Sequence, residues 1–273
     1  MRKAKRGWHI GRPHSATKAA DDYFASQARD FSLFHFFIDT VLVGDYAAHV
    51  ASTALARIED KTSPKLAFKS PVELAKSSTP GSRTVELRKK SQVYLELFLV
   101  RCVDNFNKYL VDLIREVLKK NPAILRSRQQ TLTLEAILEH SSIDELVQSI
   151  IEAKVTALSY EGFESMAVWC NDRGIPLQVS DGKSQEVVQY IATRNLISHN
   201  RGIVDERFLR AVPNSKFKVG EVRELTVNDY EHCLDLLSNT VRATDDASAR
   251  KFKLRRTRVS PRKDKGAPGK AMA

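Results

Sequence analysis

A helical repeat of apolar residues between Thr84 and Lys120 constrains the fold of this chain more than any other feature. Apolar side chains recur there every three or four residues, with charged residues on the opposite side. The stripe consists of Val93, Leu97, Val100, Val103, Leu110, Ile114 and Val117. The whole chain holds only 11 glycines and 9 prolines in 273 residues, so few positions force a helix to end. These features predict an all-α protein built from long helices.

Three further long helices are predicted downstream from the same periodicity and from residues that cap helix starts. They are Ile143–Leu158 behind the capping box of Ser141, Ser142 and Glu145, a helix that begins at Ser184, and Val227–Ala243 behind Thr226 and Asp229. A helix from Asp21 or Asp22 to about Glu59 precedes them. The predicted fold is therefore an up-down bundle of about four long helices. The N-terminal helix and a short extended arm at Phe217–Leu225 are expected to decorate it.

Shifts in composition divide the chain into five segments. Residues 61–83 contain Pro64, Pro71 and Pro80 together with a serine-rich stretch, which is typical of a linker. The predicted segments are a basic disordered tail at 1–20, an N-terminal helix at 21–60, the linker at 61–83, a helical domain at 84–246 and a second basic disordered tail at 247–273.

The net charge of +11 is concentrated at the two ends of the chain. Residues 1–20 carry six Lys and Arg and no acid, and residues 249–273 carry ten Lys and Arg and one acid. The remaining residues hold 28 bases and 32 acids, so the helical part is slightly acidic. Basic tails attract phosphate backbones without sequence preference. They also serve as solubilising segments, and their charge does not bear on catalysis.

Several classes of protein are excluded by what the sequence lacks. No apolar run reaches the ~18–20 residues of a membrane span, and no apolar stretch of a secretory signal follows the basic start. The three cysteines, Cys102, Cys170 and Cys233, lie far apart in apolar helical patterns, which fits buried thiols in a reducing compartment. We therefore expect a cytoplasmic protein with no membrane partner.

Motifs for cofactors and metals are also missing. The chain contains no GxxxxGK[ST] or GxGxxG phosphate loop, no HExxH and no paired CxxC. Trp169-Cys170-Asn171 suggests a cysteine nucleophile, but no partner base is assigned to that thiol. No cofactor and no metal site are expected.

The densest group of polar and titratable side chains outside the tails lies in Ile191–Phe208, with the sequence IATRNLISHNRGIVDERF. Asn195 and His199 stand four residues apart and share a helix face. Arg194 lies about 100° round the helix from Asn195, beside that face. Gly202 supplies a residue that adopts positive φ where the helix ends. An alternative interpretation is a plain helix C-terminus, capped by the histidine and the glycine.

This segment resembles the Arg-x4–6-His motif of the HEPN superfamily, which includes metal-independent ribonucleases. The permissive motif also matches at Arg2–His9 and at Arg29–His35. The match at Arg194 is more specific, because a polar Asn follows the Arg, a small Ser precedes the His, and the string continues as HNRGIVDERF. This extended form is similar to HEPN domains of the RiboL-PSP group. The resemblance covers roughly Val93–Ala243.

The resemblance implies that Arg194, His199 and Asn195 are catalytic and that RNA is the substrate. Histidine suits the proton transfers because its ordinary pKa is ~6.5, and arginine suits the phosphate because its planar fork stays charged. On one helix, residues five positions apart point about 140° apart, which is too divergent for a single phosphate. Two copies related by a two-fold axis place two Arg and two His around one cleft, the composite site for which HEPN ribonucleases are known. A homodimer is therefore expected.

Residues just past the motif are expected to contact RNA. They are Asn200, Arg201 and Arg207, with Arg210 as a further candidate. Asp205 either holds the tautomer of His199 or caps the next helix. Tyr160 and Tyr190 either stack on a base or pack in the core.

Three functional hypotheses remain open from the sequence. The first is a metal-independent endoribonuclease with a toxin or antiphage role, regulated by an antitoxin or another protein. The second is a non-catalytic HEPN module that binds RNA or a partner protein. The third is a helical scaffold whose basic tails contact nucleic acid or a membrane surface.

Overall fold

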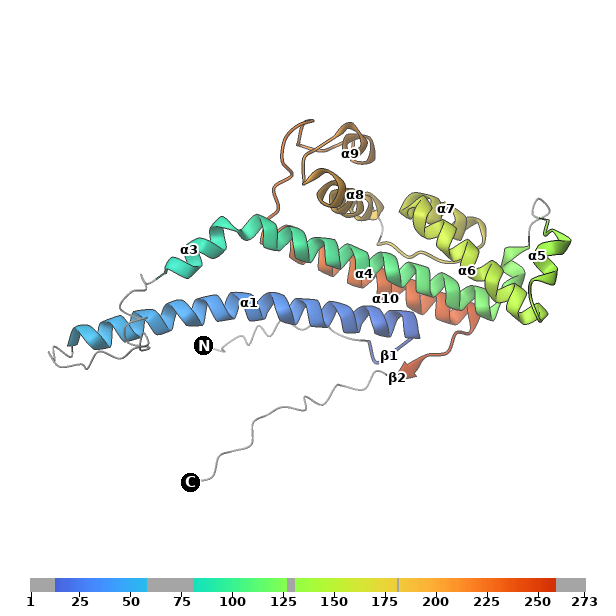
Figure 1. Cartoon of the computed structure of the whole chain (residues 1–273), viewed down its shortest axis with the longest axis horizontal. Coiled ribbons are helices and arrows are strands. Elements are labelled where there is room, and N and C mark those ends of the chain that lie inside the picture. Colours follow the sequence, from blue (N-terminus) through green and yellow to red (C-terminus); the bar gives the residue numbers. More distant parts are fainter. Residues whose placement is uncertain (1–12, 58–80, 127–130, 181, 259–273) are drawn as a thin grey trace, which may run out of the picture. The chain divides into compact units, whose positions relative to one another are not determined.

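A computed structural model of the chain describes residues 13–57, 81–126, 131–180 and 182–258 and confirms the all-α bundle (Figure 1). The helices are α1 (Lys18–Arg57), α3 (Ser82–Lys89), α4 (Ser91–Lys120), the 3₁₀ helix η1 (Pro122–Leu125), α5 (Leu134–Leu138), α6 (Ile143–Glu161), α7 (Phe163–Asp172), α8 (Ser184–Asn200), α9 (Glu206–Ala211) and α10 (Val227–Phe252). Two short strands, β1 (Ser15–Ala16) and β2 (Thr257–Arg258), pair antiparallel. Most of the predicted linker and the outer parts of both predicted tails lie outside the described residues.

The chain divides into two compact units, each with its own core. The first comprises residues 1–26, 105–184 and 236–273, and the second comprises residues 27–104 and 185–235. Helices α1, α4 and α10 each contribute residues to both units.

Large aromatic residues fill the core of the first unit. Tyr23 on α1 lies 5.9 Å from Tyr109 on α4, measured between ring centroids, and the Tyr109 hydroxyl donates a hydrogen bond to the carbonyl of Val241 on α10 at 3.3 Å. Phe106 on α4 contacts Phe163 on α7 at 6.1 Å between centroids. These contacts join four helices whose apolar sides face one another, so this core depends on residues far apart in the sequence.

The two ends of the described chain meet in the first unit, through a buried polar contact. Thr17, immediately before α1, donates from its amide and its hydroxyl to the carboxylate of Asp245 at 3.2 and 2.5 Å. Glu116 on α4 accepts a hydrogen bond from the amide of Ala19 at 2.8 Å. Two carboxylates from other helices thereby satisfy amides at the start of α1, which have no partner within that helix.

This contact explains why α10 is longer than predicted. The sequence predicts an end at Ala243, because the residues that follow are polar, but the helix continues to Phe252. Asp245 is 2% exposed and Ser248 is fully buried, so one side of the polar stretch packs into the interior. Polar composition alone therefore does not mark the end of this helix.

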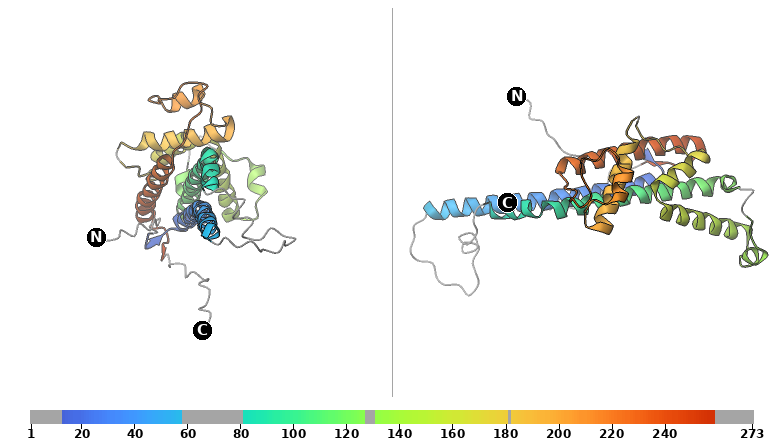
Figure 2. Two further views of the ribbon diagram at one scale, coloured as in Figure 1. Left: turned by 90° about the vertical axis from the view of Figure 1, so that its left-hand side faces the viewer. Right: turned by 90° about the horizontal axis from the view of Figure 1, so that it is seen from above.

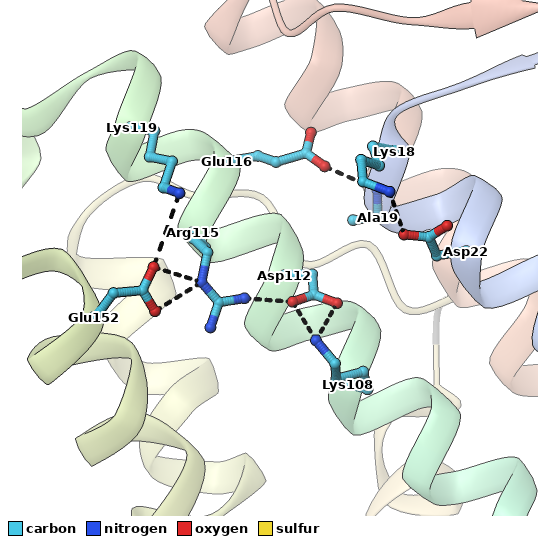
Figure 3. Close-up of polar contacts among 9 residues, drawn as sticks. All are labelled: Lys18, Ala19, Asp22, Lys108, Asp112, Arg115, Glu116, Lys119 and Glu152. Atoms are coloured by element: carbon cyan, nitrogen blue, oxygen red, sulfur yellow. Dashed lines mark hydrogen bonds and ion pairs between the residues drawn. The ribbon is translucent and has the colours of Figure 1, made fainter. Parts of the chain in front are cut away.

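Ion pairs on the outer side of α4 connect it to α6 (Figure 3). Arg115 donates from Nε to both carboxylate oxygens of Glu152 at 2.9 Å and also pairs with Asp112. Asp112 in turn accepts from Lys108 at 2.6 Å. Because these side chains are partly exposed, each pair contributes only ~0–1 kcal/mol, and the network mainly fixes the position of α6.

The core of the second unit is centred on three aromatic rings from three helices. Phe34 of α1 lies 5.1 Å from Phe98 of α4 and 5.0 Å from Tyr230 of α10, measured between ring centroids. The thiols of Cys102 and Cys233 meet beside this group at 3.9 Å, and all three cysteines are buried and free, as expected. Helix α1 is thus a core element of the bundle, whereas the sequence suggested a peripheral addition.

The apolar stripe at the start of α4 differs from the prediction. Val93 is 65% exposed and Leu97 is 53% exposed, while Leu95, Phe98 and Leu99 are buried. The helix carries apolar residues on more than one side, and the side with the aromatic ring packs inward because it buries more area. The predicted single helix from Thr84 is also broken: α3 ends at Lys89, and Lys90 adopts φ −101° and ψ 5° before α4 begins.

The start of α3 is capped by a side chain from another helix. Asp45 on α1 accepts hydrogen bonds from the amides of Arg83 and Thr84 at 3.2 and 2.7 Å and from the Thr84 hydroxyl at 2.5 Å. The bond from the Thr84 hydroxyl, followed by those from the two amides, lowers the pKa of the Asp45 carboxyl. The ionised carboxylate is therefore the form that caps α3.

Asp45→Ala is expected to speed hydrogen exchange at the amides of Arg83 and Thr84, because both lose their acceptor. Asp39→Ala, an exposed position on the same helix, is the matched control and should leave this exchange unchanged. Because the pKa of Asp45 is lowered in the folded protein, its contribution should be present above pH 3.8 and be lost as the pH falls further. Unchanged protection in the Asp45 variant would contradict the capping role.

Candidate functional site

Helix α8 carries the candidate site and buries one side against the second unit. Val187, Tyr190, Thr193 and Leu196 are buried at spacings of three residues. In this unit α4 lies between α1 and α8, and α8 crosses α4 rather than running alongside it (Figures 1 and 2). The three predicted catalytic residues lie at positions 194, 195 and 199, so they fall on the part of α8 that the core does not cover.

Arg194 is held by an acidic residue of α4. Its Nε donates to Oδ1 of Asp104 at 2.7 Å, and its Nη1 donates to Oδ1 of Asn195 at 3.2 Å. The Arg194 side chain is 26% exposed and that of Asp104 is 45% exposed. Within the described part of the chain, Nη2 has no partner, so the outer end of the guanidinium remains available to an anion. The planar fork is therefore fixed from one side and open on the other.

His199 lies in the last turn of α8 with its side chain exposed. Among the described residues, no hydrogen bond or ion pair engages its ring. Asn195, one turn earlier, is also exposed and accepts a hydrogen bond from Arg194. The structure thus joins Arg194 to Asn195, whereas the imidazole of His199, on the helix face that it shares with Asn195, lies exposed on the surface.

Two residues with positive φ end α8 immediately after the histidine. Arg201 has φ 53° and Gly202 has φ 77°. Asn200 donates from its side-chain amide to the carbonyl of Ile203 at 2.6 Å, so it belongs to the turn more than to an open surface. Gly202 is buried, and a Cβ there would lie 3.3 Å from a carboxylate oxygen of Glu96. The turn therefore requires glycine for its backbone conformation and leaves little room for a side chain.

The remaining predicted RNA contacts lie on the surface beyond this turn. Arg201 and Arg207 are both exposed, and Arg207 is on α9. Asp205 accepts a hydrogen bond from the amide of Phe208 at 2.8 Å and is the N-cap of α9. Arg210 lies 3.8 Å from Glu206, four residues earlier. Of the two roles proposed for Asp205, the structure shows the capping of α9. Arg201 and Arg207 present positive charge to solvent.

The arm predicted at Phe217–Leu225 holds this turn in place as extended chain without a regular hairpin. Val204 donates to the carbonyl of Glu221 at 2.8 Å, and Arg223 donates to the carbonyl of Gly202 at 2.8 Å. Gln92 on α4 accepts from the amide of Leu225 at 2.9 Å. The segment after His199 is therefore connected to α4 through the arm, which limits how far the end of α8 can move.

A hollow of about 290 Å³ lies next to the arm, on the other side of the turn. Its lining includes Gln189, Phe208, Phe217, Arg223 and Asp229. Arg223 is 4% exposed, donates to Asp229 at 3.0 Å and lies 4.9 Å from the ring of Phe217. Lys216 also lines the hollow, and Arg223 is paired with Asp229, so the lining carries a net positive charge.

Two aromatic residues considered for base stacking have different environments. Tyr190 is 5% exposed, and its ring packs 6.0 Å from that of His232, so it belongs to the core. Burial raises the pKa of its hydroxyl, in keeping with that position. Tyr160 is 87% exposed near the end of α6, in the first unit. Only Tyr160 therefore retains a ring face that a base can reach.

Sequence reasoning missed Asp104, the residue that fixes Arg194. Asp104 lies between buried Val103 and Phe106 on α4, 90 residues before Arg194. An acidic residue at the edge of an apolar stripe is a weak signal for a buried or half-buried pair, but a single sequence does not identify the partner. The ion pair depends on the packing of α8 on α4, which brings Asp104 next to Arg194.

Other observations bear on the class of site. Among the described residues, no group of three or more His, Cys, Asp or Glu side chains is placed to hold a metal ion. Within the same residues, no helix combines the length and the apolar character needed to cross a bilayer. Comparison of the chain with models of known protein families, with curated proteins and with solved structures finds no match.

Proposed function

We propose that this protein is a metal-independent endoribonuclease of HEPN type that uses Arg194 and His199. The observation that carries the proposal is the contrast between these two side chains on α8. Arg194 is anchored through Nε to Asp104 at 2.7 Å, while His199 is exposed and has no partner among the described residues. A fixed cation and a free imidazole are the two groups that cleavage of RNA without a metal requires.

The proposed reaction is attack of the ribose 2′-oxygen on the adjacent phosphorus. The 2′-hydroxyl gives its proton to an imidazole as the new O–P bond forms. The bond from phosphorus to the 5′-oxygen then breaks, and an imidazolium returns a proton to that oxygen. The products carry a 2′,3′-cyclic phosphate and a 5′-hydroxyl. The guanidinium of Arg194 stabilises the negative charge that develops on the phosphorane oxygens.

A second copy of the chain completes the proposed site. Arg194 and His199 are five residues apart on a continuous helix and diverge by about 140°, so a single copy does not direct both at one phosphate. The reaction also needs a base and an acid together, and one imidazole serves in only one of these roles at a time. In a two-fold dimer, one histidine acts as the base and the other as the acid, with an arginine from each copy. Arg201 and Arg207 supply further positive charge for the RNA backbone.

A second candidate function is a non-catalytic module of the same type that binds RNA or a protein. It is favoured by the contact between Arg194 and Asp104, because a guanidinium already paired with a carboxylate attracts a phosphate less strongly. In this case Arg194 stabilises the packing of α8 on α4 and His199 is a surface residue. A toxin or antiphage role, with an antitoxin or regulatory protein as partner, belongs to the first candidate only.

The first experiment is incubation of the purified protein with total RNA in EDTA. We expect cleavage by the wild type and loss of cleavage to the background level in the Arg194→Ala/His199→Ala variant. Mapping of the product ends should find 2′,3′-cyclic phosphate.

The control for this experiment is His232→Ala/Arg88→Ala, which removes one histidine and one arginine of the same unit. His232 is already paired with Glu186 at 2.6 Å, and Arg88 is exposed on α3. This variant should cleave as the wild type does. Equal cleavage by the Arg194/His199 variant and the wild type would remove the nuclease assignment, and RNA binding without cleavage would favour the second candidate.

A further inference from the structure

The outward side of α1 carries an exposed stripe that the second unit does not cover. Its residues recur at alternating spacings of three and four, which is the repeat of a coiled-coil seam. The seam consists of Leu33, Phe36, Thr40, Val43, Ala47 and Val50, all of which are exposed. It lies about 180° round the helix from Phe34, which packs into the core. Helix α1 thus has two apolar sides, and only one of them has a partner within the described chain.

The exposed area is large for a monomeric protein. Phe36 is 62% exposed, Val43 is 66% exposed, and beside the seam Phe37 and Tyr46 are 42% and 70% exposed. At 150–200 Å² for each side chain, the exposed apolar surface is on the order of 600 Å² per copy. The largest patch on a typical monomer covers about 300–600 Å², so this one is at the upper end of that range, and a stable protein interface buries about 800 Å² per partner. The patch is therefore close to the size of a specific interface.

We propose that this seam binds the same seam of a second copy, with the two α1 helices antiparallel. The residue order favours this pairing, because the largest side chain of the seam then faces the smallest. Phe36 lies opposite Ala47 of the second copy, Thr40 lies opposite Val43, and Leu33 lies opposite Val50. Since each contact occurs twice about the two-fold axis, the six residues form a closed, self-complementary surface.

Residues beside the seam fit the same arrangement. In an antiparallel helix pair, the residues on one side of the seam contact the residues on the same side of the partner's seam. This places Asp39 near Tyr46 of the second copy, where the phenol hydroxyl can donate to the carboxylate.

Parallel pairing of the same helices gives a poorer fit. Each seam residue then faces its own copy, so Phe36 meets Phe36 while Ala47 meets Ala47. The first pair is crowded and the second leaves a gap, and the seam cannot be closely packed along its whole length. The positions of Phe36 and Ala47 in the seam therefore favour the antiparallel arrangement.

This contact differs from the one that the proposed ribonuclease needs. In the second unit, α1 and α8 lie on opposite sides of α4, so the seam is remote from Arg194 and His199 (Figures 1 and 2). The pairing through α1 therefore stands without the proposed function, and its test measures association rather than RNA cleavage. If both contacts form, the protein assembles into more than a dimer.

The first test is Val43→Glu in the full-length protein, with the mass of the assembly measured by sedimentation. A carboxylate in the centre of the seam should halve the mass and weaken association at least tenfold. Val93→Glu on α4 and Val168→Glu on α7 are matched controls, because these valines are 65% and 62% exposed. Both should retain the wild-type mass. A monomeric wild type, or an unchanged mass in Val43→Glu, would overturn the proposal.

The second test is cross-linking between Leu33→Cys and Val50→Cys proteins, which reads the direction of pairing. In the antiparallel arrangement the two introduced cysteines meet across the seam, so a disulfide should form only when the two variants are mixed. Two copies of one variant hold their new cysteines about 25 Å apart, too far for a bond. Disulfides within each variant alone would show parallel pairing and refute the arrangement. The natural cysteines are buried and do not interfere.

Discussion

Arg194→Lys is expected to lower the rate of RNA cleavage by about 10²–10³-fold, although the positive charge is kept. Lysine has no Nε–H group directed sideways, so the bond to Asp104 at 2.7 Å is lost. A lysine also presents a single ammonium group in place of the planar fork, and it does not bind two phosphate oxygens in a fixed orientation. The prediction rests on the proposed nuclease function and is checked by the initial rate of cleavage of a defined RNA in EDTA.

Two comparisons separate catalysis from folding in this experiment. Arg88→Lys changes an exposed arginine of α3, outside the proposed site, and its rate should equal that of the wild type. The thermal midpoint of Arg194→Lys should stay close to the wild-type value, since a half-exposed ion pair contributes only ~0–1 kcal/mol. A lysine variant that cleaves at the wild-type rate would show that charge alone suffices and that the fork geometry is irrelevant.

Asp104→Asn tests whether Asp104 orients Arg194 or neutralises its charge. Asparagine retains an oxygen that accepts from the Arg194 Nε, so the guanidinium stays in place while the neighbouring negative charge is removed. If Asp104 serves to orient Arg194, this variant should lose far less activity than Arg194→Lys. If Asp104 mainly neutralises the arginine, as in the non-catalytic alternative, Asp104→Asn should instead bind RNA more tightly.

The helix boundaries that could be predicted are those set by local chemistry. Ser142 accepts from the amide of Glu145 at 3.2 Å, and Thr226 and Asp229 form reciprocal bonds at the start of α10. The chain segment that forms such a cap is only four residues long, so the sequence contains all the information. The end of α4 before Pro122 follows from the missing amide and steric demands of proline in the same way.

Features that depend on distant residues could not be predicted. The burial of Asp245 needs Thr17, 228 residues earlier, and the position of Arg194 needs Asp104 on another helix. Periodicity alone also did not decide which apolar side of α4 packs inward, since Val93 and Phe98 fit the repeat equally well. The candidate site was therefore located by its residue types, while its geometry came from the fold.

Asp245 on α10 is the buried carboxylate on which the second large prediction depends. It is 2% exposed and accepts both hydrogen bonds from Thr17, whose own side chain is fully buried. Arg256 lies 4.0 Å away and donates to the carbonyl of Ser15 at 2.6 Å, so the segment after α10 is joined to the strand before α1. Removal of the carboxylate affects both ends of the described chain.

Asp245→Ala is expected to lower the free energy of unfolding by about 2–4 kcal/mol, measured by urea denaturation. The amide and hydroxyl of Thr17 then lose their acceptor in a place that water does not reach. Asp246→Ala is the matched control, because this neighbouring carboxylate is half exposed and accepts from Arg256 on the surface. It should change stability by less than ~1 kcal/mol. Equal effects of the two substitutions would show that the buried contact with Thr17 is not important for stability.

The pH dependence of Asp245 has the opposite sign to that of Asp45. Burial raises the pKa of Asp245 above 3.8, although the bonds from Thr17 act in the other direction. Between 3.8 and the raised pKa, the folded protein holds a proton that the unfolded chain has released, so the free energy of unfolding falls as the pH rises through this window. Glu116 has a pKa raised by burial in the same way. The wild type should therefore gain stability relative to Asp245→Asn as the pH is lowered from 7 to 3.8, because only the carboxyl can take up the proton. A constant difference between the two proteins over this range would mean that Asp245 is ionised in both the folded and the unfolded chain.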